Sequence, residues 1–218
     1  MKKVFLIGGL GADERVFQNL TFPGFEKVFI HWLIPTKNES LEKYSKRLSE
    51  QITESNPLIL GVSFGGMLAV EMMKFYTSSK VFIVSSAKTS HELPLIYRII
   101  GRLGLLKIVP AKAFTYHTRV IDWFFGVENK WESNLLKSII QDTNVSFLKW
   151  ALQQITLWNN QTFTSNLTHI HGDKDRILPI GSSTPNYIIH GGGHFMILNR
   201  AKEIEEILQH KFTNSLIH

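Results

Sequence analysis

The chain has 218 residues, of which 44% are hydrophobic and 19% are charged, a composition that suits one globular domain with a sizeable core. It contains no cysteine, which excludes disulfide bonds, thiolate metal sites and a cysteine nucleophile. The formal net charge is +6, but the lysines and arginines are scattered, so we expect a basic solvated surface and no nucleic-acid partner. No apolar run approaches the ~20 residues of a membrane span, and the N-terminal apolar run ends at glycines without a cleavage site. We therefore expect a cytoplasmic protein without stable membrane insertion.

The first part of the chain alternates between strand-like and helix-like segments. Four apolar, β-rich runs predict strands: 3–7, 25–33, 58–62 and 80–84. The segments between them have apolar residues at helical spacing: 13–20, 40–54 and 64–76. Ser40 is expected to cap the second helix, because its hydroxyl can accept a hydrogen bond from a free backbone N–H. This order implies a parallel sheet with helices on both faces.

The alternation is interrupted between residues 88 and 164, where helical patterns and aromatic residues predominate and no strand is predicted. It resumes with two strands, 167–171 and 186–189, and a closing amphipathic helix, 200–212. We therefore expect an α/β core of residues 1–87 and 165–218, with a compact, mostly parallel sheet of about six strands flanked by helices. Residues 88–164 are expected to form a helical cap inserted after the strand 80–84.

The strand 58–62 runs directly into Gly61-Val62-Ser63-Phe64-Gly65-Gly66, and an apolar helical segment follows. A Gly-x-Ser-x-Gly sequence between a buried strand and a helix is typical of a nucleophile elbow, a strained turn that presents a serine hydroxyl. Gly61 and Gly65 remove side chains that would collide where the strand and the helix pass closely. The same pattern also occurs in inert glycine-rich turns, so the assignment of Ser63 as nucleophile depends on partners elsewhere in the chain.

A second glycine-rich turn, Gly8-Gly9-Leu10-Gly11, follows the first predicted strand. It does not complete a dinucleotide-binding fingerprint, because Glu14 occupies the position of the third glycine and no carboxylate ends the second strand. The chain also lacks a phosphate-binding Gly-Lys-Ser or Gly-Lys-Thr loop, and we expect neither a cofactor nor a metal. The turn instead offers the backbone N–H of Leu10 which, together with that of Phe64, would form an oxyanion hole.

A nucleophilic serine needs a histidine as base and a carboxylate that orients this histidine. Of the nine histidines, His194 is the best candidate, because it follows the last predicted strand in the glycine-rich loop 191–195. Asp173 and Asp175 both follow the strand 167–171. We favour Asp175, which lies further into its loop, and expect Asp173 to stabilise the turn. The loop after the strand 80–84 contains no carboxylate, which strengthens this choice.

With these three residues in the order Ser63, Asp175, His194, the sequence resembles the α/β-hydrolase family. The resemblance implies ester-type hydrolysis through an acyl-enzyme, in which Ser63 attacks the carbonyl, His194 transfers the proton and Asp175 holds His194. A serine at the elbow argues against the dehalogenase branch, which uses an aspartate there. The sequence departs from the family in lacking an initial antiparallel hairpin and in having Gly8-Gly9 where His-Gly is frequent, so the usual polar support of the oxyanion turn is missing.

Substrate choice is expected to depend on the cap, whose aromatic residues would line an apolar pocket for a small acyl substrate. The candidates are Trp123, Phe124 and Trp150 of the cap and Phe195 beside His194, with Phe125, Trp131 and Trp158 as further cap aromatics. Each cap aromatic could instead pack the cap onto the sheet. Residues 88–164 include nine basic and five acidic residues, which indicates an anionic acceptor group or an anionic surface. Thioester, lactone or carbon–carbon bond cleavage on the same triad, or a slow-turnover ligand receptor, remain alternatives, and the oligomeric state is open.

Overall fold

The computed structural model describes residues 1–107, 109 and 116–214. The described residues form one sheet of six strands in the order β2-β1-β3-β4-β5-β6, and every neighbouring pair is parallel. The strands are β1 (Lys2–Ile7), β2 (Phe25–Phe29), β3 (Leu58–Val62), β4 (Lys80–Val84), β5 (Leu167–Gly172) and β6 (Tyr187–Ile189). The predicted six-stranded parallel sheet is confirmed, and this sheet contains no antiparallel hairpin.

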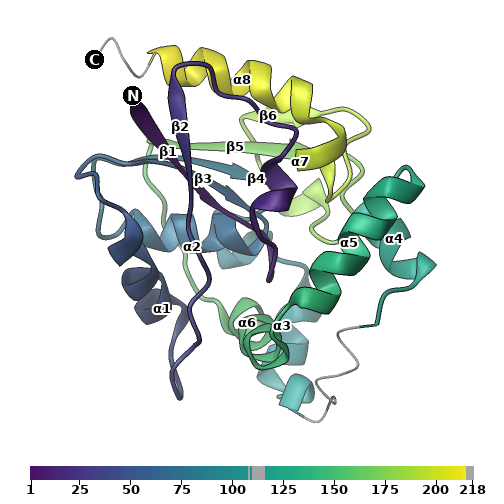
Figure 1. The fold of residues 1–218 in the computed structure, drawn as a ribbon. Helices are drawn as coiled ribbons and strands as arrows, with labels where there is room; N and C mark the ends of the chain where they lie inside the picture. Colours follow the sequence, from purple (N-terminus) through teal and green to yellow (C-terminus); the bar gives the residue numbers. More distant parts are fainter. Residues whose placement is uncertain (108, 110–115, 215–218) are drawn as a thin grey trace.

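Helices cover both faces of the sheet and extend beyond one end of it (Figure 1). They are α1 (Leu41–Leu48), α2 (Phe64–Met72), α3 (Leu95–Arg102), α4 (Arg119–Phe125), α5 (Lys130–Asp142), α6 (Val145–Leu157), α7 (Met196–Asn199) and α8 (Ala201–Asn214). Short 3₁₀ turns occur at η1 (Glu14–Phe17), η2 (Ser49–Gln51), η3 (Ser90–Glu92), η4 (Leu105–Lys107) and η6 (Ile180–Ser182). The predicted cap of α1 is confirmed, since the Ser40 side chain accepts a hydrogen bond from the backbone N–H of Lys43.

The two faces of the sheet bury different side chains of the same strands, because neighbouring residues of a strand point in opposite directions. Val4 and Leu6 of β1 belong to the core beneath α8, whereas Phe5 and Ile7 belong to the core formed with α1 and α2. Figure 1 shows α8 on one side of the sheet and α1 and α2 on the other. Burial on both faces explains why the strands read as apolar runs without polar alternation.

Some predicted elements are shorter in the structure. The segment 13–20 is a single 3₁₀ turn, η1, and the helix predicted over 64–76 ends at Met72. The strand predicted over 25–33 ends at Phe29. The N–H of Ile30 still donates to the carbonyl of Leu6 in β1 (2.9 Å), but the chain beyond it bonds to side chains. The N–H of His31 donates to the Gln51 side chain (3.0 Å), and that of Leu33 donates to the Tyr44 hydroxyl (3.0 Å).

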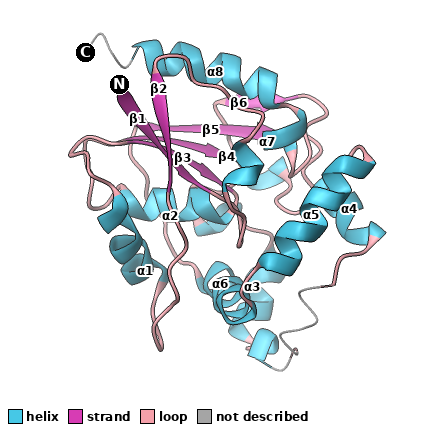
Figure 2. Cartoon of the chain, viewed as in Figure 1, coloured by secondary structure: helices cyan, strands magenta, loops and turns pink. Residues whose placement is uncertain are grey.

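The segment between β4 and β5, residues 88–164, is called the insertion below. Its described residues form helices α3 to α6 and no strand, and Figures 1 and 2 show these helices grouped beyond the end of the sheet where β3 and β4 terminate. Ligands of open α/β sheets bind at this carboxyl end. The division of the chain into a core and a separate cap domain stays a prediction.

No helix within the described ranges is both long enough and apolar enough to cross a bilayer.

Candidate active site

Ser63 lies at the sharp turn between β3 and α2 with a backbone φ of 52° and ψ of −119°. A positive φ is unfavourable for a residue with a side chain, so the turn stores strain and is held by its neighbours. The N–H of Ser63 donates to the carbonyl of Val84 (2.9 Å), and the Ser86 hydroxyl donates to the carbonyl of Ser63 (2.7 Å). The end of β4 therefore holds the elbow in place.

Two glycines allow the backbone to approach itself around this turn. A Cβ atom on Gly61 would lie 2.5 Å from the carbonyl oxygen of Gly65, so the strand and the helix pass each other as the sequence predicts. A Cβ atom on Gly65 would overlap the carbonyl oxygens of Ile7 and Gly8. The second glycine thus makes room for the turn after β1 rather than for β3, which brings the two glycine-rich turns together.

His194 and Asp175 converge on Ser63 from two other loops at the same end of the sheet. The Nε2 atom of His194 lies 2.9 Å from the Ser63 Oγ atom, and its Nδ1 atom lies 2.8 Å from the Asp175 Oδ2 atom. Since a carboxylate only accepts hydrogen bonds, Nδ1 carries the imidazole proton and Nε2 is free to accept the hydroxyl proton of Ser63. The three residues form the serine, histidine and carboxylate arrangement that the sequence predicts.

The carboxylate of Asp175 is buried, and its other oxygen has two backbone donors. Its Oδ1 atom accepts hydrogen bonds from the N–H groups of Ile177 (2.9 Å) and Leu178 (2.8 Å). Burial by itself raises the pKa of Asp175, but the charge and hydrogen bond of His194 and the N–H of Leu178 outweigh it, so the pKa lies below the ordinary 3.8. Asp175 is therefore ionised at neutral pH and can stabilise a protonated His194.

Asp173 has a structural role, but it contacts a second loop and not only its own turn as expected from the sequence. Its Oδ1 atom accepts the N–H of Gly191 (2.8 Å), and its Oδ2 atom lies 3.0 Å from Nδ1 of His190. These contacts join the loop that carries Asp175 to the loop that carries His194. Asp173 thus positions two loops without approaching Ser63 itself.

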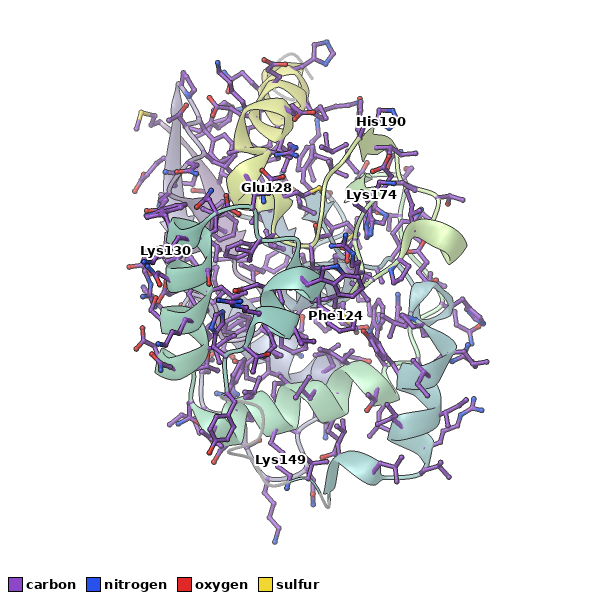
Figure 3. The ribbon with its side chains drawn as sticks, turned by 90° about the vertical axis from the view of Figure 1, so that its right-hand side faces the viewer. Phe124, Glu128, Lys130, Lys149, Lys174 and His190 are labelled. Atoms are coloured by element: carbon purple, nitrogen blue, oxygen red, sulfur yellow. The ribbon has the colours of Figure 1, made fainter. Side chains whose placement is uncertain are left out.

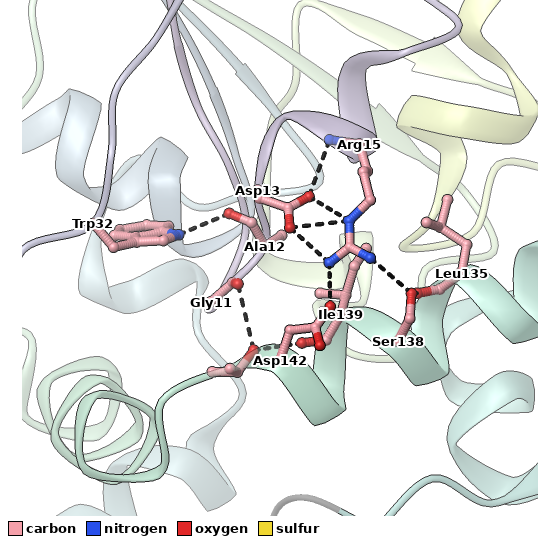
Figure 4. A network of polar contacts seen from close by, with 10 residues as sticks. Gly11, Ala12, Asp13, Arg15, Trp32, Leu135, Ser138, Ile139 and Asp142 are labelled. Atoms are coloured by element: carbon pink, nitrogen blue, oxygen red, sulfur yellow. Dashed lines mark hydrogen bonds and ion pairs between the residues drawn. The ribbon is translucent and has the colours of Figure 1, made fainter.

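The predicted oxyanion turn is held by contacts that replace the missing His-Gly support (Figure 4). The indole N–H of Trp32 donates to the carbonyl of Ala12 (2.7 Å), and the N–H of Ala12 donates to the carbonyl of Gly9 (2.9 Å). From the insertion, the Thr143 side chain packs against the turn, with its hydroxyl oxygen 3.3 Å from the carbonyl oxygen of Gly11 while it donates to the carbonyl of Ile139 (2.7 Å). The turn is therefore braced from the segment after β2 and from the end of α5.

An ion-pair network also joins this turn to α5 (Figure 4). The guanidinium of Arg15 lies 2.6 Å from Asp13 and 2.7 Å from Asp142, and it donates to the Ser138 hydroxyl (3.0 Å). Within the described part of the chain, no protein group accepts a hydrogen bond from the backbone N–H of Leu10 or of Phe64. Both residues line the same cavity as Ser63, which leaves the two N–H groups available to a ligand.

Comparisons with known proteins show which fold this chain has. No family model matches the chain, and no curated protein matches it. A solved thermophilic esterase is similar at a TM-score of 0.72 with 19% identity, over 98% of this chain and 90% of that one. A meta-cleavage product hydrolase from Pseudomonas fluorescens is similar at a TM-score of 0.72 with 16% identity, over 99% and 92%. The protein has the α/β-hydrolase fold.

A third similar structure is an esterase from Exiguobacterium antarcticum, with a TM-score of 0.69 and 13% identity over 95% of this chain and 90% of that one. At these identities the similarity shows the fold alone, and the roles of the site residues depend on their own geometry. In the α/β-hydrolase fold of this chain, Ser63, Asp175 and His194 follow β3, β5 and β6 respectively. These strand ends meet at one edge of the sheet.

A cavity of about 430 Å³ lies beside Ser63 and His194. Its walls come from the oxyanion turn, from α2 and from the insertion helices, and most of its side chains are aliphatic. They include Val16, Ile100, Leu136, Ile139, Leu148, Leu152 and Ile155. No lysine, arginine, aspartate or glutamate of the described residues lines it, and its polar side chains are those of Ser63, Tyr97, Thr143, Thr156 and His194. The cavity suits an uncharged, apolar group.

Three of the four aromatic residues predicted to line the pocket do not line it. Trp123 and Phe124 are 57% and 43% exposed on α4, and Figure 3 labels Phe124 on that helix. The indole N–H of Trp150 donates to the carbonyl of Glu39 (2.9 Å), so this ring packs the insertion onto the segment before α1. Phe195 does line the cavity, as does Phe125. The prediction was wrong for Trp123 and Phe124 because the sequence does not tell which side of α4 faces the cavity, and for Trp150 because its ring packs the insertion onto the core.

The other two cap aromatics also lie outside the cavity lining. Trp131 is 50% exposed. Trp158 is buried, and its indole N–H donates to the Glu71 carboxylate (2.7 Å), which fastens the end of α6 to α2. Trp150 and Trp158 therefore do pack the insertion onto the core, but onto the region of α1 and α2 and not onto the sheet itself.

Two buried histidines that the sequence analysis did not single out lie behind Asp175. Nε2 of His169 lies 2.9 Å from Nδ1 of His171, and Nε2 of His171 lies 2.7 Å from the carbonyl of Leu178. A carbonyl only accepts, so His171 carries its proton on Nε2, and His169 then donates to His171. The Nε2 atom of His171 is also 3.6 Å from the Asp175 carboxylate. This N–H donates to Leu178, so the His171 ring lies beside the carboxylate that holds His194 without a hydrogen bond to it.

Both histidines remain neutral in the fold. Burial, followed by the charge of His171, lowers the pKa of His169 to about 3, and burial lowers the pKa of His171 below its ordinary 6.5. The signal for this pair is present in the sequence, because residues two apart on a strand share one face of the sheet. Within the described residues, no cluster of three or more histidine, aspartate or glutamate side chains is arranged to hold a metal ion.

Proposed function

We propose that this protein is a serine hydrolase that cleaves small carboxylic esters with an apolar acyl group through an acyl-enzyme. The observation that carries the proposal is the chain of two hydrogen bonds, 2.9 Å from Ser63 to His194 and 2.8 Å from His194 to Asp175, in the wall of an apolar cavity. These are the contacts that a hydroxyl needs in order to act as a nucleophile at neutral pH. The strained backbone of Ser63 presents its oxygen at this point.

Each residue has a defined step in this mechanism. His194 takes the proton of Ser63 as the hydroxyl oxygen attacks the ester carbonyl, and Asp175 stabilises the imidazolium that forms. The N–H groups of Leu10 and Phe64 donate to the oxyanion of the tetrahedral intermediate. His194 then delivers the proton to the leaving alcohol. A water molecule, activated by the same imidazole, hydrolyses the acyl-enzyme and restores the Ser63 hydroxyl.

The lining of the cavity favours a neutral substrate. One similar structure is a 2-hydroxy-6-oxo-6-phenylhexa-2,4-dienoate hydrolase, with a TM-score of 0.69 and 16% identity over 97% of this chain and 90% of that one, and the dienoate in its name is a carboxylate. Burying a carboxylate in an apolar cavity is costly unless a cation or several donors meet it. No basic side chain of the described residues lines the cavity. This argues for an ester over such an acid, and against the anionic acceptor considered from the sequence.

Turnover of p-nitrophenyl esters of increasing acyl length tests the proposal. We expect Ser63→Ala to lose nearly all activity, on the order of 10⁶ in kcat, as for nucleophile removal in other serine hydrolases. Ser85→Ala is the matched control, because Ser85 also has a positive φ (48°), ends the neighbouring strand and has no hydrogen-bond partner for its hydroxyl among the described residues. It should retain activity.

A fluorophosphonate that reacts with activated serines provides an independent readout by mass spectrometry. We expect the label on Ser63 in the wild type and in Ser85→Ala, and no label in Ser63→Ala. Thioesters and lactones with the same acyl group belong in the same panel, since the triad can also act on them. The proposal fails if the wild type hydrolyses none of the substrates, or if Ser63→Ala hydrolyses them as fast as the wild type does.

A further inference from the structure

The outward face of α3 is apolar, although it faces solvent. Leu95, Ile96, Ile99 and Leu103, at the end of the helix, are 65%, 56%, 40% and 67% exposed. Their spacing places them on one side of the helix. An ordinary solvent-facing helix surface carries polar side chains there.

The opposite side of α3 contacts the rest of the protein, and these contacts hold the helix with its apolar face toward solvent. The Tyr97 hydroxyl donates to the carbonyl of Ile177 (2.8 Å), next to the loop of Asp175, and Ile100 lines the cavity. Gly101 meets α6 so closely that a Cβ atom there would come within 2.5 Å of the Thr156 carbonyl oxygen. Rotating α3 to bury its apolar face would break these contacts. The exposure is therefore built into the packing of the insertion.

The charges on α3 itself are of one sign. Arg98 and Arg102 lie on α3, the helix contains no acidic residue, and neither arginine has an ion pair with a described residue. Glu92, the acidic residue that precedes the helix, is buried and lies 3.6 Å from Lys88. An apolar face flanked by uncompensated arginines matches a surface that combines apolar chains with negative headgroups.

We propose that this face of α3 docks onto an anionic lipid surface. A second copy of the chain fits less well, because face-to-face docking would bring the arginines of both copies together without acidic partners. One helix of eight residues also presents only a small part of the about 800 Å² per partner that a stable protein interface buries. Docking would place α3, whose inner side contributes Tyr97 and Ile100 to the cavity wall, between the cavity and the lipid. The delivery of a lipid-borne ester rests on the proposed function, whereas the binding itself does not.

Vesicle co-sedimentation of the Ser63→Ala protein tests the binding without turnover. The probes are vesicles of phosphatidylcholine alone and vesicles that also contain phosphatidylglycerol. We expect binding to the mixed vesicles and at least tenfold weaker binding to the neutral ones. Replacing both arginines (Arg98→Gln with Arg102→Gln) should weaken binding to the mixed vesicles by roughly fivefold for each charge, which corresponds to about 1 kcal/mol per basic residue near the surface. The matched charge control is Lys43→Gln with Lys202→Gln, on α1 and α8.

The apolar part of the surface is tested by Leu95→Ser, Ile99→Ser and Leu103→Ser combined. We expect at least tenfold weaker binding, because membrane affinity scales with the apolar area that is buried. The control is Ile34→Ser with Ile188→Ser, two exposed aliphatic residues elsewhere. All variants are compared by thermal unfolding and, with Ser63 restored, by hydrolysis of a water-soluble ester, so that a folding defect is distinguished from lost docking.

Three results would overturn the proposal. One is a Ser63→Ala protein that does not bind the mixed vesicles, or binds them no more tightly than the neutral ones, and another is undiminished binding by the triple serine variant. The third is a concentration-dependent dimer in gel filtration that the triple serine variant abolishes, which would assign the face to contacts between copies. A protein with Ser63 intact that binds the vesicles but hydrolyses no ester would count against the proposed function alone and not against lipid docking.

Discussion

The two sides of the candidate site are built on different principles. Beneath Ser63, polar atoms meet partners at defined distances, from His194 through Asp175 to the N–H groups of Ile177 and Leu178. Above it, the insertion lines a cavity with aliphatic side chains that have no directional contacts to offer. Hydrogen bonds depend steeply on geometry, whereas apolar contacts depend mainly on buried area. We therefore expect the loops of the sheet to determine the chemistry and the insertion to determine which acyl groups enter.

The largest expected effect comes from the polar side. Asp175→Asn should lower kcat by on the order of 10⁴, because a neutral amide neither stabilises the imidazolium nor favours the reactive tautomer of His194. The matched control is Asp173→Asn, which weakens the contact between the two loops but leaves the carboxylate at Asp175. It should cost less than tenfold. Steady-state kinetics on one p-nitrophenyl ester measure both, and equal losses would contradict the separate roles of the two aspartates.

The next effect concerns pH and stability. The fold lowers the pKa of His169 from 6.5 to about 3 through burial and the neighbouring His171. The unfolded chain therefore binds a proton below pH 6.5 that the folded chain does not bind, so stability is complete above pH 6.5 and declines as the pH falls toward 3. From pH 6.5 to pH 4 the free energy of unfolding should fall by about 3 kcal/mol, at about 1.36 kcal/mol per pH unit.

Urea unfolding at several pH values measures this decline. The lowered pKa of His171 acts in the same direction, whereas Asp175, with a pKa below 3.8, contributes only at lower pH. His169→Gln should flatten the dependence between pH 4 and pH 6.5, and His31→Gln, at an exposed position, should leave it unchanged. A wild type whose stability does not change over this range would contradict the neutral buried pair.

A smaller effect is expected on the apolar side. Leu152→Trp should fill part of the cavity and reduce kcat/KM for long acyl esters while sparing the acetyl ester. Excluding three methylene groups costs about 2.4 kcal/mol at about 0.8 kcal/mol each, which is roughly a 50-fold change in the ratio of the two kcat/KM values. Leu157→Trp, at an exposed position on the same helix, is the control and should leave the ratio unchanged. A uniform loss on all esters would show that the insertion also affects the chemistry.

The smallest effect tests the junction between the two sides. Arg15→Gln removes the contacts of the oxyanion turn with Asp142 on α5. Because Arg15 is partly exposed, we expect a stability loss of no more than about 1 kcal/mol, together with a several-fold lower kcat from a less well placed Leu10 N–H. Arg200→Gln, which breaks the pair with Glu128, should cost similar stability without lowering kcat. If both variants had the same kcat, the contacts of Arg15 would not be what positions the oxyanion turn.

Much of the site was predictable because its signals are local in the sequence. Ser63 was found from the strand, the glycines and the helix around it, and Asp175 and His194 from loops that follow predicted strands. The pair His169 and His171 was missed, although their spacing on a strand places both on one face. Two histidines at such a spacing do not indicate a particular role until their neighbours in the fold are known. Here those neighbours are Leu178 and Asp175.

The sequence by itself determined the six parallel strands, the elbow and the order of the three polar residues, since apolar periodicity and turn chemistry depend on neighbours along the chain. Only the tertiary structure decided that α4 directs Phe125 rather than Phe124 at the cavity, that Trp32 and Thr143 brace the oxyanion turn, and that α3 leaves Leu95 and Ile99 in solvent. Those outcomes depend on how each segment is oriented, and for a helix on its rotation about its own axis, relative to elements that are distant in the chain. A periodic pattern defines a helix and its apolar side, but it does not define what that side will meet.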